Sequence, residues 1–206
     1  GQGGDVSITS DIEYDKEGIV FNCNILDAPV HLRAFGEFQA MNALPCIYIA
    51  KACHLKEDSI LNGLKNLEMT KMRTQLIPVK NAYILDDTYK SNPESAKAAI
   101  DTLMELSARK HIAILSDMLD LGSEEKQMHY DVGVYAKEKG VDELYCTGPL
   151  SKETAEGFNG KWYETKDEIY EACKPLLEED CVIMIKGSRA MQMDTLVDAF
   201  RGKNNE

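Results

Sequence analysis

The sequence lacks any long apolar run, because polar residues interrupt every stretch well before the roughly 18 residues that a membrane-spanning helix needs. Residues 1–5 read Gly-Gln-Gly-Gly-Asp and have neither the basic start nor the apolar centre of a secretion signal. We therefore expect a cytoplasmic protein with no membrane span. The opening glycines also look like the edge of a cut, since a native start would normally show Met.

Cysteine pairs and histidine clusters of the kind that bind zinc are absent too. The six cysteines stand at irregular spacings inside apolar stretches, with no C-x-x-C pair, and the four histidines are scattered. This pattern favours buried free thiols in a reducing compartment over disulfides, and it predicts no metal site. The cysteines are Cys23, Cys46, Cys53, Cys146, Cys173 and Cys181.

Positive charge is scarce. Lys and Arg number 23 against 35 Asp and Glu, giving a net charge of −12 without a local basic patch, which argues against a nucleic-acid partner. With 44% hydrophobic and 28% charged residues, the composition is that of a globular protein and excludes a disordered, collagen-like or coiled-coil chain. The 206 residues exceed the ~150 typical of one domain, so an appendage or a second small domain is expected.

The first part of the chain predicts a hairpin followed by two helices. Residues 6–10 alternate and residues 19–26 are extended, which together indicate a β-hairpin, and a lone hairpin must belong to a larger sheet or pack on a helix. Apolar positions recur every three or four residues over 36–54 and predict an amphipathic helix despite Pro45. A second helix is predicted over 59–66 with Asp58 as its cap.

The second part predicts an α/β domain. Short apolar runs alternate with longer helical patterns, which is typical of a doubly wound, mainly parallel, Rossmann-like sheet. The little-structured stretch around residue 72 is the expected boundary, giving domains 1–72 and 73–206. The predicted strands are 82–85, 112–115, 143–146 and 181–185, with a weaker one near 162–163, and the predicted helices are 93–107, 123–139, 151–157, 166–177 and 190–200.

In such a sheet, ligands bind beyond the carboxyl ends of the strands, and here the residues after the strands are polar. The adjacent carboxylates Asp86 and Asp87 could accept hydrogen bonds from a ribose diol or hold Mg²⁺; alternatively, one of them caps the helix at Pro93 or starts a turn. The run Lys186-Gly187-Ser188-Arg189 suits an anion at a helix start, or is a solvated turn.

Three familiar catalytic motifs are missing. The sequence contains no phosphate loop of the form G-x-x-x-x-G-K-[ST], no dinucleotide fingerprint and no G-x-S-x-G nucleophile elbow. Composition and spacing alone therefore predict an α/β domain for an anionic ligand and leave its reaction open.

Read together, however, the loops resemble one family, the Mur ligases. The residues that carry the resemblance to its C-terminal domain are 86–95, 117–122 with His129, and 186–191, while Gly36, 42–44 and 72–73 resemble the end of its central ATPase domain. The branch it resembles joins D-alanyl-D-alanine to UDP-N-acetylmuramoyl-tripeptide. The resemblance implies that residues 1–72 are the trailing part of the central domain and that 73–206 are the C-terminal domain.

The resemblance implies an ATP-dependent amide ligation, by way of an acyl phosphate and with ADP as product. Both steps build negative charge on oxygen, so Mg²⁺, lysine and backbone donors are the expected stabilisers. The family's phosphate loop and magnesium ligands would lie in an N-terminal portion outside this sequence. We therefore expect the chain by itself to be inactive.

The resemblance also implies roles for single residues. Asn42 would bind adenine, and Arg73 and Asp87 would hold the ribose hydroxyls. Tyr89, Lys90 and Asn92 would line the phosphate or substrate side, with Tyr89 and Asn92 assigned to the nucleotide and Lys90 to the substrate; Asp117, Lys186, Ser188 and Arg189 would approach the dipeptide or acyl group. His129 would lie on a helix face rather than act as a base. Phe38, Lys90 and Ser116 depart from the family pattern of His, Asn and Gly.

Two alternatives stay open. One is a noncatalytic ligand-binding or partner-binding module with the same C-terminal fold; the other is a sibling Mur ligase or a folylpolyglutamate-type ligase. The run Lys186-Gly187-Ser188-Arg189 is the feature that favours the D-alanyl-D-alanine branch.

Overall fold

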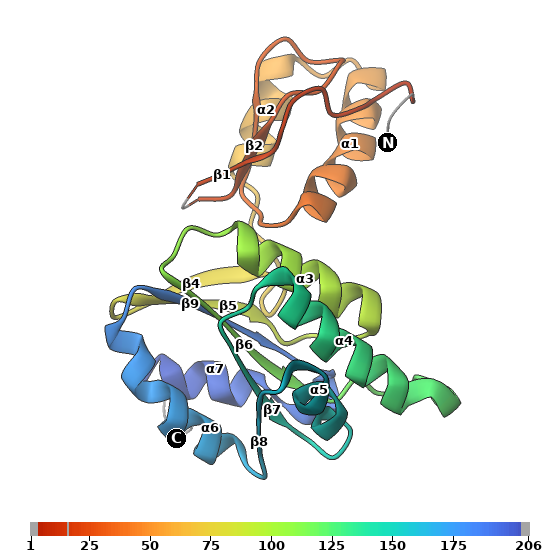
Figure 1. Cartoon of the computed structure of the whole chain (residues 1–206). Helices are drawn as coiled ribbons and strands as arrows, with labels where there is room; N and C mark the ends of the chain where they lie inside the picture. Colours follow the sequence, from red (N-terminus) through yellow and green to blue (C-terminus); the bar gives the residue numbers. More distant parts are fainter. Residues whose placement is uncertain (1–3, 16, 203–206) are drawn as a thin grey trace. The chain divides into compact units, whose positions relative to one another are not determined.

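The computed structural model describes residues 4–15 and 17–202. Contacts between residues divide the chain into two compact units, Gly1–Thr70 and Lys71–Glu206, which are called the first and second unit here (Figure 1). The division falls within the stretch of little periodicity that precedes residue 73. The assignment of the first unit to a central ATPase domain stays a prediction.

The first unit contains a three-stranded antiparallel sheet in the order β1-β2-β3, formed by β1 (Glu13–Tyr14), β2 (Ile19–Phe21) and β3 (Val30–Leu32). The predicted hairpin was therefore partly wrong. Residues 19–21 form a strand, but it pairs with β1 on one side and β3 on the other. Residues 6–10 do meet residues 22–24, through the isolated Ile8–Cys23 bridge and the backbone bonds of Thr9 to Asn22 and of Asn24 to Ser7, but they form no regular strand. The reason is local: Asp15 Oδ1 accepts the N–H groups of Glu17 and Gly18 and closes the turn that brings β1 onto β2.

Two helices complete the first unit, α1 (Glu37–Ala52) and α2 (Glu57–Lys65). One face of α1 packs on the sheet, but Met41, Tyr48 and Ile49 are exposed, so the helix is less amphipathic than predicted. The prediction that Asp58 caps α2 was wrong. Asp58 lies inside the first turn, where its charge complements the helix dipole.

All six cysteines are free, but only four are buried. Cys46 and Cys53 are exposed, so the expectation of buried thiols fails for these two. The physical reason is that Cys46 lies outside the buried stripe of α1, which is formed by Ala40, Ala43, Leu44 and Ile47, and Cys53 is the C-cap residue of the same helix.

The second unit contains a six-stranded sheet in the order β4-β5-β9-β6-β7-β8. All neighbouring strands are parallel except the hairpin of β4 and β5, which confirms the predicted doubly wound, mainly parallel α/β fold. The edge strand β4 was missed, because Pro78 argues against a strand except at a sheet edge. The strands are β4 (Gln75–Val79), β5 (Ala82–Asp87), β6 (Lys110–Ser116), β7 (Glu143–Thr147), β8 (Lys161–Tyr163) and β9 (Cys181–Lys186).

Helices cover both faces of this sheet (Figure 1). The helices α3, α4 and α5 lie on one face, and α6 and α7 on the other. Three predicted helices are shorter than expected, because short 3-10 turns replace part of each at Gly122–Glu124, Lys174–Glu178 and Arg189–Met191. The helices are α3 (Pro93–Glu105), α4 (Glu125–Lys139), α5 (Ser151–Phe158), α6 (Lys166–Cys173) and α7 (Asp194–Phe200).

The core of the second unit follows from the alternation of strand side chains. Ile84, Ile114 and Ile183 pack with residues of α6 and α7, while their chain neighbours point to the opposite face. On that face α4 and α5 approach closely, because a Cβ atom on Gly133 would lie 2.1 Å from the carbonyl oxygen of Thr154. Among residues 4–15 and 17–202, no helix has the length and apolar character needed to cross a bilayer.

Candidate functional site

The carboxyl ends of four parallel strands meet at one edge of the sheet in the second unit. The register pairs Asp87 of β5 with Lys186 of β9, and Leu115 of β6 with the same Lys186. Strand β6 in turn pairs with β7 as far as Ser116 and Thr147. The loops that carry most of the predicted site residues therefore begin side by side (Figure 1).

Asp87 and Lys186 form an ion pair at this edge. Lys186 Nζ lies 2.5 Å from Asp87 Oδ2 and 2.8 Å from the carbonyl oxygen of Lys90, and its side chain is 2% exposed. The other carboxylate oxygen of Asp87 accepts from the backbone N–H and the hydroxyl of Thr74, at 3.1 and 3.3 Å. A buried ammonium needs such partners because desolvation opposes its charge. The pair thus joins β5, β9 and the residue before β4.

The neighbouring carboxylate of Asp86 has a different environment. It is buried, and its Oδ1 accepts from the hydroxyl and the N–H of Thr88, at 2.7 and 3.2 Å. Burial raises the pKa of Asp86 above its ordinary value, although the two bonds from Thr88 oppose the shift. Of the two adjacent carboxylates, Asp87 is the better placed to reach a ligand, because 15% of its side chain is exposed.

The loop after β5 also holds an arginine and a tyrosine together. The guanidinium of Arg73 lies 4.3 Å from the ring centroid of Tyr89, whose backbone N–H donates to the carbonyl of Met72 at 3.1 Å. At an exposed site such a cation–π contact contributes about 0.5–1 kcal/mol and favours the two side chains lying together. Lys90 contributes its carbonyl to Lys186, while its own ammonium group lies on an exposed residue.

Asn92 acts as the N-cap of α3. Its Oδ1 accepts from the N–H of Ser95 at 2.8 Å, and the Ser95 hydroxyl accepts from the N–H of Asn92 at 3.0 Å. This reciprocal pair is a capping box, and Pro93 follows at the first helical position. The resemblance assigns Asn92 to the nucleotide; its side-chain oxygen already accepts the cap hydrogen bond, so its amide nitrogen is the freer group for a ligand.

Asp117, in the loop after β6, is 2% exposed. Its Oδ1 accepts from the N–H and the hydroxyl of Ser151, at 2.8 and 2.7 Å, at the start of α5. Gly148 passes so close that a Cβ atom there would lie 2.4 Å from the same oxygen. Asp117 therefore ties the loops after β6 and β7 together.

Ser188 and Arg189 follow β9. Ser188 donates its N–H to the carbonyl of Asp117 at 3.0 Å and accepts from the N–H of Leu119 through Oγ at 2.9 Å. Arg189 forms an ion pair with Asp194 at 2.8 Å, and 56% of its side chain is exposed. Arg189 is thus more open to an anionic ligand than Ser188, whose polar groups bind the neighbouring loop.

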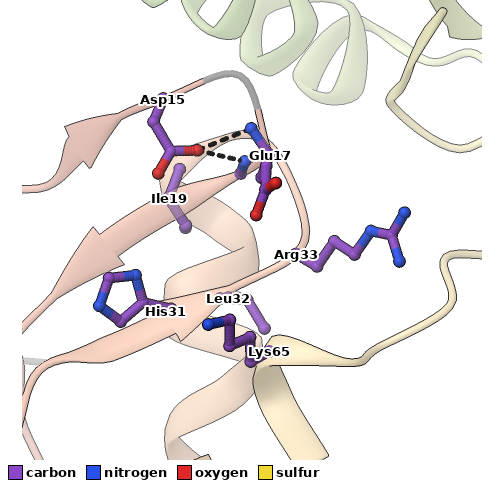
Figure 2. A pocket seen from close by; sticks show the side chains of 8 residues that line it. Asp15, Glu17, Ile19, His31, Leu32, Arg33 and Lys65 are labelled. Atoms are coloured by element: carbon purple, nitrogen blue, oxygen red, sulfur yellow. Dashed lines mark hydrogen bonds between the residues drawn. The ribbon is translucent and has the colours of Figure 1, made fainter. Parts of the chain in front are cut away.

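Asn42 belongs to the first unit, on the exposed side of α1. Its amide nitrogen lies 3.4 Å from Gln39 Oε1. Figure 2 shows a separate pocket of about 260 Å³ in this unit. Asp15 and Arg33 are among its lining residues, but the Asp15 carboxylate binds the N–H of Glu17 in the turn, and the Arg33 side chain extends away from the pocket. Asn42 is not among its lining residues.

Another groove, of about 620 Å³, lies in the second unit at the turn between β4 and β5. Its floor includes Tyr170 and Phe200, and its cations are Lys80, Lys174 and Arg201. Each of these cations already has an acidic partner, and none of the predicted site residues lines the groove. The groove is therefore separate from the candidate site.

No cluster of metal-ligating side chains marks a magnesium site among the described residues. Within residues 4–15 and 17–202, no three His, Cys, Asp or Glu side chains gather as metal ligands would. In the adjacent pair Asp86 and Asp87, the oxygens already bind Thr88, Thr74 and Lys186, so a metal ion would have to share these oxygens with the protein donors.

Sequence reasoning missed the polar residues that complete the site. Thr74, Thr88 and Ser151 supply the donors that hold Asp87, Asp86 and Asp117 in place. No motif gave them a role: Thr88 lies within the stretch 86–95 that carries the family resemblance, while Thr74 and Ser151 are single hydroxyls in a loop and at a helix start. Only Ser151 carries a usable signal, because it follows Gly148-Pro149 at the start of a predicted helix.

Comparison with known proteins then decides the family. The model of the family described as "Mur ligase, glutamate ligase domain" matches residues 72–189, which is more than half of the chain. The chain belongs to the Mur ligase family. Curated relatives named UDP-N-acetylmuramoyl-tripeptide--D-alanyl-D-alanine ligase include one from Bacillus subtilis, 27% identical over 91% of this chain and 43% of the relative. One from Escherichia coli is 32% identical over 81% and 37%, respectively.

Solved Mur ligase structures have the same fold over nearly the whole chain. MurF from Acinetobacter baumannii superposes with a TM-score of 0.87 at 27% identity, covering 98% of this chain and 46% of that protein. MurF from Thermotoga maritima, solved with ADP, has a TM-score of 0.84 at 20% identity and supports the fold alone, with coverages of 98% and 47%. The chain spans less than half the length of the curated relatives described above.

Proposed function

We propose that the chain is the C-terminal part of a cytoplasmic, ATP-dependent ligase that joins D-alanyl-D-alanine to UDP-N-acetylmuramoyl-tripeptide in peptidoglycan precursor synthesis. Two relatives named for this reaction match 91% and 81% of the chain. The observation that carries the proposal is the meeting of the three family motifs at one sheet edge, where Asp87, Lys186 and the Asp117–Ser188 contact lie at the ends of neighbouring strands.

For the nucleotide side we propose Asp87, Arg73 and Tyr89. Each oxygen of a carboxylate has two lone pairs, so Asp87 retains acceptor capacity for a ribose hydroxyl beyond its bonds to Thr74 and Lys186. The Arg73–Tyr89 stack presents a cation and an aromatic ring beside it. Asn42 of the first unit is proposed for adenine from the resemblance.

For the substrate side we propose Arg189 and Lys90, whose cationic groups are available to carboxylate or phosphate. Lys186 is enclosed by Asp87 and the Lys90 carbonyl, so we propose that it acts by orienting Asp87. Asp117 and Ser188 are proposed to shape the loops that present Arg189.

We also propose that the 206-residue chain alone has no ligase turnover. Its sequence contains no phosphate loop, and the described residues do not gather magnesium ligands. ATP and Mg²⁺ chemistry would require the groups that the resemblance places in an N-terminal portion of the enzyme.

The reaction is tested with the full-length enzyme, by measuring phosphate release with ATP, the tripeptide nucleotide and different acceptors. We expect release to depend on D-alanyl-D-alanine. Equal release with D-Glu or a diamino acid would instead favour a sibling ligase, and no release with any acceptor would favour the noncatalytic module.

The site is tested with Asp87→Ala in the same enzyme. Losing a contact to the ribose should raise KM for ATP about tenfold, because a hydrogen bond to a charged group contributes roughly 1.5–3 kcal/mol. The control is Asp167→Ala, since Asp167 is an exposed residue in the first turn of α6. An unchanged KM for ATP would remove Asp87 from the nucleotide site.

A further inference from the structure

His129 of α4 is fully buried, at 0% exposure, and has no role in the ligand contacts proposed above. Its Nε2 lies 2.9 Å from the backbone nitrogen of Met118, and its Nδ1 lies 2.7 Å from the carbonyl oxygen of Glu125. A backbone N–H can only donate and a carbonyl can only accept. The ring must therefore carry its proton on Nδ1 and use a bare Nε2 as the acceptor for Met118, which makes it a neutral imidazole.

Met118 is the middle residue of a segment that is held on both sides. The carbonyl of Asp117 accepts from the N–H of Ser188 at 3.0 Å, and the N–H of Leu119 donates to the hydroxyl of Ser188 at 2.9 Å. Three consecutive residues after β6 are thus fixed by backbone hydrogen bonds, one of them to α4 and two to the loop after β9. Of these three bonds, the one from His129 is made by a helix residue, and the two from Ser188 are made by a loop residue.

We propose that His129 is a positioning residue that locks the loops after β6 and β9 into one arrangement through its Nδ1–H tautomer. Without the ring acceptor, the N–H of Met118, a residue 2% exposed, would be left buried and unpaired, so the loop would have to shift to satisfy it. Because Ser188 is bound to the residues on either side of Met118, the shift would reach Arg189, the cation proposed above for the substrate.

The tautomer is tested by nitrogen-15 NMR of the imidazole rings in the 206-residue chain. His111 is the internal reference: its Nε2 lies 2.8 Å from the carbonyl of Leu106 and must carry a proton. We expect opposite tautomers, with Nδ1 protonated and Nε2 bare in His129. A proton on Nε2 of His129 at neutral pH would overturn the proposal.

The coupling is tested by amide hydrogen exchange in His129→Leu and His129→Gln. The leucine variant removes the acceptor, whereas the glutamine oxygen can replace Nε2. We expect exchange at Met118 and at Ser188 to become about tenfold faster or more in His129→Leu, and to be largely restored in His129→Gln. His111→Leu, at the other end of β6, is the matched control and should leave both amides unchanged.

A general loss of stability would accelerate exchange in the sheet core as well, for example at Ile114 and Ile185. Equal acceleration there, or an unchanged Ser188 amide in a folded His129→Leu variant, would overturn the proposal. If His129→Leu does not fold, the tautomer measurement and the exchange pattern of His129→Gln still test the proposal. Slow exchange at Met118 and Ser188 must persist in His129→Gln, and fast exchange there would overturn the proposal.

The catalytic consequence rests on the proposed ligase function and is measured in the full-length enzyme. We expect His129→Leu to lower kcat about tenfold with KM for ATP unchanged, and His129→Gln to recover most of it. Failure of the ligase proposal would appear as an inactive wild-type enzyme, whereas failure of this inference would appear as an active enzyme in which His129→Leu has normal kcat.

Discussion

Charged side chains are buried at one end of the sheet in the second unit and partly exposed at the other. At the carboxyl ends of the strands, Lys186, Asp117 and Asp86 are buried at 1%, 2% and 5% exposure and are bound by several donors or acceptors each. At the amino ends, the ion pair of Lys110 and Glu143 has both side chains 29% exposed. A partly exposed pair contributes little to stability, but a buried charge needs its partners.

The two ends differ in how many segments of the second unit depend on one charged side chain. Lys186 and Asp117 each connect two separate segments, so losing either side chain disturbs more than one strand, whereas Asp86 binds only Thr88 of its own loop. The surface pairs at the amino end connect neighbouring strands that backbone hydrogen bonds already hold. We therefore expect equivalent substitutions to have unequal effects at the two ends, and the single tryptophan, Trp162 in β8, reports on unfolding of the second unit.

The largest effect is expected for Lys186→Met, which removes the ammonium from a buried pair with Asp87. The second unit should lose roughly 3 kcal/mol of unfolding free energy, measured by urea titration of Trp162 fluorescence, because a charge is left without its partner. Lys110→Met at the amino end is the control and should cost at most about 1 kcal/mol. Equal losses would mean that the two ends do not differ.

A smaller loss is expected for Asp117→Ala, which removes two hydrogen bonds to Ser151. The unfolding free energy should fall by about 2 kcal/mol, and Asp117→Asn should recover at least half because it keeps an acceptor oxygen. At the amino end, Asp142→Ala loses one bond to the N–H of His111 and should cost about 1 kcal/mol or less. If Asp142→Ala cost more, burial would not be the deciding factor.

Asn92→Ala should cost about 1 kcal/mol of unfolding free energy through loss of the α3 cap. Thr165→Ala removes the equivalent capping box of α6 and should cost the same. The two variants separate structure from binding: if Asn92 also contacts the nucleotide, Asn92→Ala should raise KM for ATP in the full-length enzyme and Thr165→Ala should not. Matching KM values would leave Asn92 with the cap alone.

The smallest effect is expected in the pH dependence of the unfolding free energy, to which Asp86 at one end and Glu143 at the other should contribute with opposite sign. Burial raises the pKa of Asp86, so its contribution is full below the ordinary value of 3.8 and is lost as pH rises through the raised value. For Glu143, burial alone would raise the pKa, but the bonds from Lys110 and Tyr145 lower it below 4.5, so its contribution is present above 4.5 and lost as pH falls.

These signs are read from urea midpoints of Trp162 fluorescence between about pH 3 and 8, a range that extends below the ordinary pKa of Glu143. Relative to wild type, Asp86→Asn should gain stability as pH rises, and Glu143→Gln should be destabilised at neutral pH with the difference shrinking as pH falls. The same slope for both variants would contradict the assignment of burial at one end and ion pairing at the other.

Much of the fold of the second unit could be predicted from the sequence. Short, nearly continuous apolar runs are typical of strands buried on both faces of a parallel sheet, and they correctly predicted β5, β6, β7 and β9. The parallel order of these strands brings their carboxyl ends to one edge. The strands β3 and β4 could not be predicted. β3, in the first unit, has only three residues, and β4 contains Pro78, so the position of each depends on the strand with which it pairs.

The sequence by itself determined which residue types follow the strands, the class of the fold and the resemblance to the Mur ligases. Only the tertiary structure decided how each polar residue is used: Asn92 became a helix cap, Asp117 a tie to Ser151, and Lys186 a partner of Asp87. The physical reason is that a polar side chain can bind a ligand, a helix end or another side chain with the same atoms. Which partner it takes depends on the groups that burial leaves within about 3 Å.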